Sequence, residues 1–166
     1  AAEIVRKIKD AAPVPVTVKF RKGWDSGSEN AVEFAKTLEA AGADMLTVHG
    51  RTAVQMYSGR SDLDSIKKVK AAVHIPVLAN GDIISVDAYK KAISYTEADG
   101  AMIGRAAFGN PFVFAELKAY IEGKDAPLPP KLSDKMSLFL KQTELHIEDK
   151  GEQIAMLEAR KHMAWY

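Results

Sequence analysis

The chain has 166 residues, 47% hydrophobic and 27% charged, and its 23 basic and 22 acidic side chains leave a formal net charge of +1. This length suits one soluble domain with an appendage and allows a buried core without disulfides or a structural metal. The absence of cysteine excludes thiol nucleophiles, zinc–thiolate sites, iron–sulfur clusters and disulfides within these residues, and the charge alone predicts no nucleic-acid partner.

The first ten residues, AAEIVRKIKD, predict a charged amphipathic helix and not a signal peptide. No stretch is apolar for long enough to span a membrane, so no membrane partner is expected. The absence of cysteine gives no sign of an oxidising compartment, and we therefore expect a cytoplasmic protein. The chain does not start with methionine, and its last residues, ARKHMAWY, stop inside a helical pattern. Both ends are therefore expected to be cut from a longer chain.

Short apolar runs alternate with amphipathic helices over the first 110 residues. Nearly all-apolar runs are typical of strands buried on both faces of a parallel sheet, and they predict strands at 14–20, 45–49, 76–79 and 101–103. Helices are expected at 29–40, 62–71, 86–94 and 111–121. Ser28, Ser61 and Ser85 are predicted to cap the first three of these helices, and Gly42 is predicted to follow the end of the first.

This alternation is typical of an open doubly wound sheet or of a closed (β/α)8 TIM barrel. A whole barrel needs about 250 residues, so four units predict half a barrel. The segment KDAPLPPKL predicts a proline-rich linker, and the helical patterns after it predict the start of an all-helical module. The expected domains are a half-barrel at 1–122, a linker at 123–132 and a partial helical domain at 133–166.

Ligands of both architectures bind beyond the carboxyl ends of the strands. The four predicted strand ends carry Lys19, His49, Asn80 and the pair Gly104-Arg105. A lysine in an apolar run reaches solvent, pairs with a structural acid or meets an anionic ligand. A histidine at a strand end is either a structural hydrogen-bonding residue or part of a site.

The turns after the last two predicted strands indicate an anion site. Asn80-Gly81-Asp82 exposes backbone N–H groups, and Gly104-Arg105 adds a guanidinium, which together suit a phosphate. In barrel enzymes the loops after strands 7 and 8 frequently bind phosphate. Glycine and asparagine also occur in ordinary turns because they tolerate positive φ, so each tripeptide alone is weak evidence.

The ordered segments VTVKFRKGW, TVHGRTAVQMYSGRSDLDSI, IPVLANGDI and GAMIGRAAFGNPF resemble the tRNA-dihydrouridine synthases, most of all the bacterial B-type branch. The terminal ARKHMAWY is similar to that family's helical-domain motif. The resemblance implies an FMN-binding (β/α)8 barrel followed by a helical tRNA-binding domain, with the four strands here as strands 5 to 8. It also implies an enzyme that reduces uridine to 5,6-dihydrouridine in tRNA, with hydride passing from NADPH through FMN.

The resemblance assigns two sets of binding residues. Contacts to FMN are implied for Lys19, His49, Asn80, Gly81, Asp82, Gly104 and Arg105. Contacts to RNA are implied for Arg51, Tyr57, Arg60, Arg160, Lys161 and His162. A packed loop aromatic would account equally well for Tyr57, and a solvated helix face for the three residues at 160–162.

The family's general acid is a cysteine in the loop after strand 4, which would precede residue 1. No catalytic residue is therefore expected in these 166 residues, and the chain alone is expected to be inactive. The alternatives are another FMN-binding or phosphate-binding barrel enzyme, such as a dihydroorotate dehydrogenase relative, or a non-catalytic RNA-binding or assembly fragment. Open half-barrel edges predict self-association. No metal site is expected.

Overall fold

The computed structural model describes all residues, 1–166, and their contacts group them into two compact units. The first unit comprises residues 1–83 and 87–103, and the second comprises 84–86 and 104–166. The expected domain limits at residues 122 and 133 stay a prediction. Residues 124–131, within the predicted linker, form no helix or strand.

A parallel sheet of four strands in chain order lies at the centre of the first unit. The strands are β1 (Thr17–Arg21), β2 (Met45–His49), β3 (Val77–Asn80) and β4 (Gly100–Met102). The predicted alternation of strands and helices, and with it the α/β class, is confirmed. β1 begins later than predicted because the Val16 N–H donates to the Asp44 carboxylate, at 2.6 Å, and not to a neighbouring strand.

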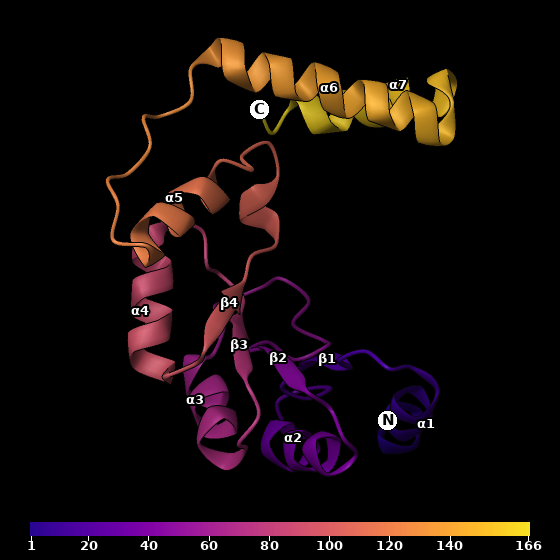
Figure 1. The fold of residues 1–166 in the computed structure, drawn as a ribbon, viewed down its shortest axis with the longest axis vertical. Coiled ribbons are helices and arrows are strands. Elements are labelled where there is room, and N and C mark those ends of the chain that lie inside the picture. The colour runs from indigo at the N-terminus through magenta and orange to yellow at the C-terminus, as the bar shows by residue number, and fades with distance from the viewer. The chain divides into compact units, whose positions relative to one another are not determined.

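Helices of the first unit cover one face of this sheet. They are α1 (Ala2–Ala11), α2 (Ala31–Ala40), α3 (Leu63–Ala72) and α4 (Val86–Thr96). Figure 1 shows α2 and α3 side by side along the strands. Between helices and strands lies a core of fully buried aliphatic side chains, whose removal from water drives the packing. Its completely buried members include Leu38, Leu46, Val48, Ile66, Val69 and Val77.

Two of the predicted helix caps are wrong. Asp62, not Ser61, caps α3, because its carboxylate accepts the N–H groups of the first helical turn with the added strength of a charged acceptor. Asn30, not Ser28, lies at the N-cap of α2. Gly42 follows the end of α2 as predicted, with φ of +95°. The cap at Ser85 stays a prediction.

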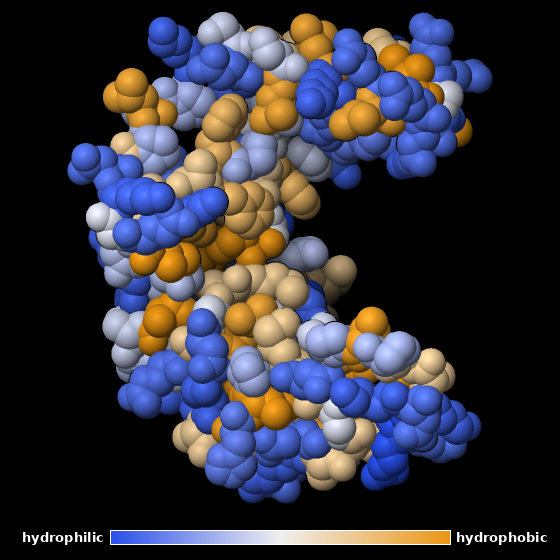
Figure 2. All heavy atoms as spheres, in the orientation of Figure 1, coloured by the Kyte–Doolittle hydropathy of each residue, from blue (hydrophilic) through white to orange (hydrophobic).

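The second unit is helical. It contains a 3-10 turn, η1 (Arg105–Ala107), and the helices α5 (Val113–Ile121), α6 (Leu132–Lys150) and α7 (Glu152–Met163). The helical patterns predicted after the linker form α6 and α7, which lie side by side (Figure 1). Figure 2 shows hydrophobic residues scattered among hydrophilic ones over this helix pair. None of the helices combines the length and apolar character needed to cross a membrane.

Candidate functional site

The pairing of the strands places polar side chains in one row across the carboxyl end of the sheet. Arg21 is in register with His49, and His49 is in register with Asn80. Residues in register on neighbouring parallel strands point to the same face. Lys19 lies two residues before Arg21 and so shares that face. The sequence-based prediction named Lys19 as the strand end and missed Arg21, although the alternation of Lys19 and Arg21 was a signal that could have identified it.

Lys19 reaches solvent from the edge strand β1. No carboxylate lies within ion-pair distance of its Nζ, so the alternative of a pair with a structural acid does not apply. Partial desolvation, and next the positive charge of Arg21, lowers the pKa of Lys19. An exposed amine with no acidic partner is available to an anionic ligand.

His49 is buried and neutral. Burial, followed by the positive charges of Arg21, Lys19 and Arg51, lowers the pKa of His49 to about 4. Its Nε2 lies 3.5 Å from Nη1 of Arg51. Because a guanidinium can only donate, Nε2 is the acceptor in this long contact and Nδ1 carries the proton. At neutral pH the imidazole therefore offers one N–H donor and no positive charge.

Arg51 has only 2% of its surface exposed. Its guanidinium donates to the carbonyls of Ser58 and Gly59, at 3.0 and 2.7 Å, and Nη2 lies 2.8 Å from both carboxylate oxygens of Asp82. A guanidinium enclosed in this way has no face to offer RNA. The predicted RNA contact of Arg51 is therefore corrected to a structural role that joins the loop after β2 to the loop after β3.

The turn after β3 packs directly against His49. Gly81 has φ of +113°, and a Cβ there would lie 2.4 Å from Oγ of Ser61 and 2.8 Å from Cδ2 of His49. Only glycine fits this position. Asp82 accepts the Ser61 N–H at 2.7 Å in addition to the Arg51 guanidinium. The structure thus brings three predicted cofactor residues, His49, Asn80 and Gly81, into one place.

Gly104 and Arg105 belong to the second unit, where Gly104 precedes η1 and Arg105 begins it. Nothing lies within 4 Å of the position that a Cβ on Gly104 would take. Open space at a glycine next to an arginine is compatible with close approach of a ligand. A phosphate site that these residues share with the turn after β3 stays a prediction.

The three predicted RNA contacts on α7 fall into two groups. Arg160 and Lys161 are exposed, and their contacts with RNA stay predictions. His162 is half-buried: its Nδ1 lies 3.1 Å from Nε2 of Gln142, and its ring stacks on Trp165 with centroids 5.1 Å apart. His162 therefore contributes to packing between α6 and α7, and its predicted contact with RNA stays a prediction.

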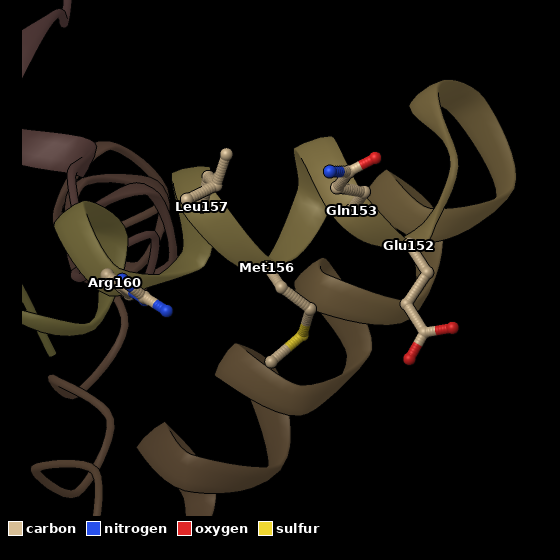
Figure 3. Close-up of a pocket in the computed structure, with 5 residues that line it drawn as sticks. All are labelled: Glu152, Gln153, Met156, Leu157 and Arg160. Atoms are coloured by element: carbon tan, nitrogen blue, oxygen red, sulfur yellow. The ribbon is translucent and has the colours of Figure 1, made fainter.

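Arg160 also lines an open hollow of about 510 Å³ on α7 (Figure 3). Glu152 and Met156 point to the same side of the helix in this view, one turn apart. The hollow therefore combines charged and apolar side chains along one helix.

Tyr57 and Arg60 are exposed in the loop after β2. The guanidinium of Arg21 lies 5.8 Å from the centroid of the Tyr57 ring, within the range of a cation–π contact. Their contacts with RNA stay predictions. No group of three or more histidine, aspartate or glutamate side chains is arranged to hold a metal ion.

Comparison with known proteins gives a consistent result. Residues 1–166 match the family model described as dihydrouridine synthase. A probable tRNA-dihydrouridine synthase of Rickettsia conorii is 40% identical over 100% of this chain and 50% of its own length. The tRNA-dihydrouridine synthase B of Vibrio vulnificus is 44% identical over 99% of this chain and 51% of its own. The chain spans about half the length of the curated relatives it matches.

Proposed function

Because the chain belongs to the dihydrouridine synthase family, we propose that it is part of an FMN-dependent oxidoreductase that reduces uridine to 5,6-dihydrouridine in tRNA, with NADPH as reductant. The family predicted from the motifs is confirmed, as is the TIM-barrel type of α/β fold. The match includes the terminal helices, which argues against other flavin-binding barrels. The proposed tRNA substrate also makes a cytoplasmic location the expected one.

One observation supports the proposal most: Lys19, His49 and Asn80 share one face of the sheet, and Gly81 closes against His49. This donor set fits a flavin. The Lys19 amine has no acidic partner, the imidazole is neutral, and a glycine turn lets a ligand approach the backbone.

When bound, FMN would supply the hydride that reduces the uracil ring. Lys19 would hold positive charge beside the flavin ring and favour negative charge there. His49 would donate from Nδ1 while staying neutral, because its pKa of about 4 prevents protonation at physiological pH. Arg105 would bind the FMN phosphate through a charge-assisted hydrogen bond. The chain has no cysteine, so these residues offer no thiol as a proton donor.

Flavin titration tests this proposal. The purified chain is expected to quench FMN fluorescence, and Arg105→Ala is expected to weaken FMN binding by about tenfold or more, the value of one charged hydrogen bond. Arg6→Ala, which removes an exposed arginine from α1, is the matched control. Binding of riboflavin as tight as that of FMN would contradict the phosphate contact, and absence of flavin binding would contradict the proposal. With FMN and NADPH present, the chain alone is expected not to reduce tRNA uridine.

We also propose that copies of this chain self-associate. β1 and β4 each pair with only one strand of the sheet, which leaves backbone donors and acceptors available to another chain. Sedimentation equilibrium over a range of protein concentrations measures this directly, and a single monomeric species throughout would contradict it.

A further inference from the structure

Large apolar side chains stand exposed on two neighbouring loops at the carboxyl end of the sheet. Trp24 belongs to the loop after β1, and Val54, Met56 and Tyr57 belong to the loop after β2. Each side chain is between 57% and 70% exposed. We call these four residues the loop patch. A cluster of exposed apolar side chains on a soluble protein marks an interaction site.

Backbone hydrogen bonds join the two loops. The Ala53 N–H donates to the Gly23 carbonyl and the Val54 N–H donates to the Trp24 carbonyl, both at 2.9 Å. A Cβ at Gly23 would lie 2.6 Å from the carbonyl oxygen of Ser28, so the loop after β1 is folded too tightly for any other residue there. Trp24 is therefore presented by a well-supported backbone.

Arg21 supports the other side of the loop patch. Its guanidinium donates to the carbonyls of Thr52 and Met56, at 2.7 and 2.9 Å, beside the Tyr57 ring. Met56 has φ of +49°, a left-handed conformation that costs a residue with a side chain roughly 1 kcal/mol or more. The hydrogen bonds from Arg21 help to offset this cost and support the loop in this conformation. A preformed surface loses little conformational entropy when it binds a partner.

The charges around the loop patch favour a polyanionic partner. Lys19 and Arg60 are exposed, and no carboxylate lies within ion-pair distance of either side chain. The acids of the same loops are engaged within the protein. Asp25 accepts hydrogen bonds inside its own turn, Asp62 caps α3, and Asp82 pairs with the buried arginine. Lys19 and Arg60 thus offer two positive charges without an acidic partner, whereas Asp62 and Asp82 are paired with cations and Asp25 alone of these three acids keeps an unpaired negative charge.

We propose that the loop patch binds an unpaired nucleobase of the RNA substrate by stacking, with Trp24 and Tyr57 as the stacking rings. Aromatic rings next to cationic side chains are the arrangement that binds single-stranded nucleic acid: each base has a π face to stack, and lysine and arginine bind the adjoining phosphates. A base within a duplex has both faces covered and does not stack on a protein ring. This inference rests on the proposed function, which names tRNA as the substrate.

Trp24 can report on its own contact. The chain has two tryptophans, so a Trp165→Phe variant leaves Trp24 as the only one. Single-stranded oligouridylate is expected to quench its fluorescence. The same RNA annealed into a duplex, and inorganic polyphosphate, are expected to leave the fluorescence unchanged.

Substitutions of Trp24 separate stacking from simple apolar contact. Trp24→Phe retains an aromatic ring and is expected to keep most of the affinity for the oligonucleotide, whereas Trp24→Leu retains apolar area alone and is expected to lose about tenfold. Ile4→Ala, which removes an apolar side chain of 63% exposure from α1, is the matched control and is expected to bind normally.

Equal affinity of the Trp24→Leu and Trp24→Phe variants would overturn the inference, as would quenching by duplex RNA or polyphosphate. A change in Trp24 fluorescence with protein concentration and without RNA would assign the loop patch to a second copy of the chain and also overturn it. If FMN and tRNA still bind the Trp24→Leu variant normally, the stacking inference fails and the proposed function stands. Absence of FMN and tRNA binding in the unmodified chain would instead count against the proposed function.

Discussion

Replacement of Arg51 by methionine tests whether its buried guanidinium stabilises the loops around the candidate site. Removal of one partner from a buried ion pair costs about 3 to 5 kcal/mol. The lower value applies here because the Asp82 side chain is 38% exposed and can recover hydration. The carbonyls of Ser58 and Gly59 also lose their donor. We therefore expect Arg51→Met to lower the free energy of unfolding by about 3 kcal/mol.

Urea unfolding at pH 7, followed by circular dichroism, measures this loss. The matched control is Arg60→Met, which removes an exposed arginine from the same loop. Because Arg60 has no carboxylate partner, this substitution is expected to change the free energy of unfolding by less than about 0.5 kcal/mol. A loss below about 1 kcal/mol, or equal losses in the two variants, would refute the structural role of Arg51. Because the charge of Arg51 also contributes to the lowered pKa of His49, that pKa is expected to rise in Arg51→Met, as measured by NMR titration.

Two further predictions concern pH and packing. The pKa of His49 is lowered to about 4 in the folded chain, against about 6.5 in the unfolded chain. Protons therefore favour the unfolded state. The contribution of His49 to the free energy of unfolding should fall by about 3 kcal/mol as the pH drops from 6.5 to 4. Urea unfolding across this range measures the loss, and a His49→Gln variant with the same pH dependence would contradict the assignment. Gly109 has φ of +62°, and a Cβ there would lie 2.0 Å from the carbonyl oxygen of Trp165, whereas Gly123 has φ of +65° and open space around it. Gly109→Ala should therefore destabilise the second unit by about 2 kcal/mol more than Gly123→Ala. Thermal unfolding followed through tryptophan fluorescence measures this difference. Equal losses of stability would show that Gly109 does not lie against the Trp165 backbone.

Local patterns predicted most of the secondary structure. Apolar runs of strand length between amphipathic helices identified all four strands. This is possible because the order of apolar and polar residues within a segment decides whether it can bury one stripe of a helix or both faces of a strand. The left-handed turn at Gly42 was also predictable, since only residues within the turn determine its φ. The motifs around Lys19, His49, Asn80 and Arg105 were sufficient to predict the family.

The sequence by itself thus determined the α/β class, the order of the elements and the family. Only the tertiary structure decided what several side chains do. Arg51 meets Asp82 across 31 residues, so no local pattern could show that its guanidinium is enclosed within the protein. Gln142 likewise meets His162 across 20 residues. The exposure of Trp24 and the position of Arg21 beside His49 likewise depend on how strands and loops pair. Contacts between distant residues form through packing, and packing fixes which polar groups stay available to a ligand.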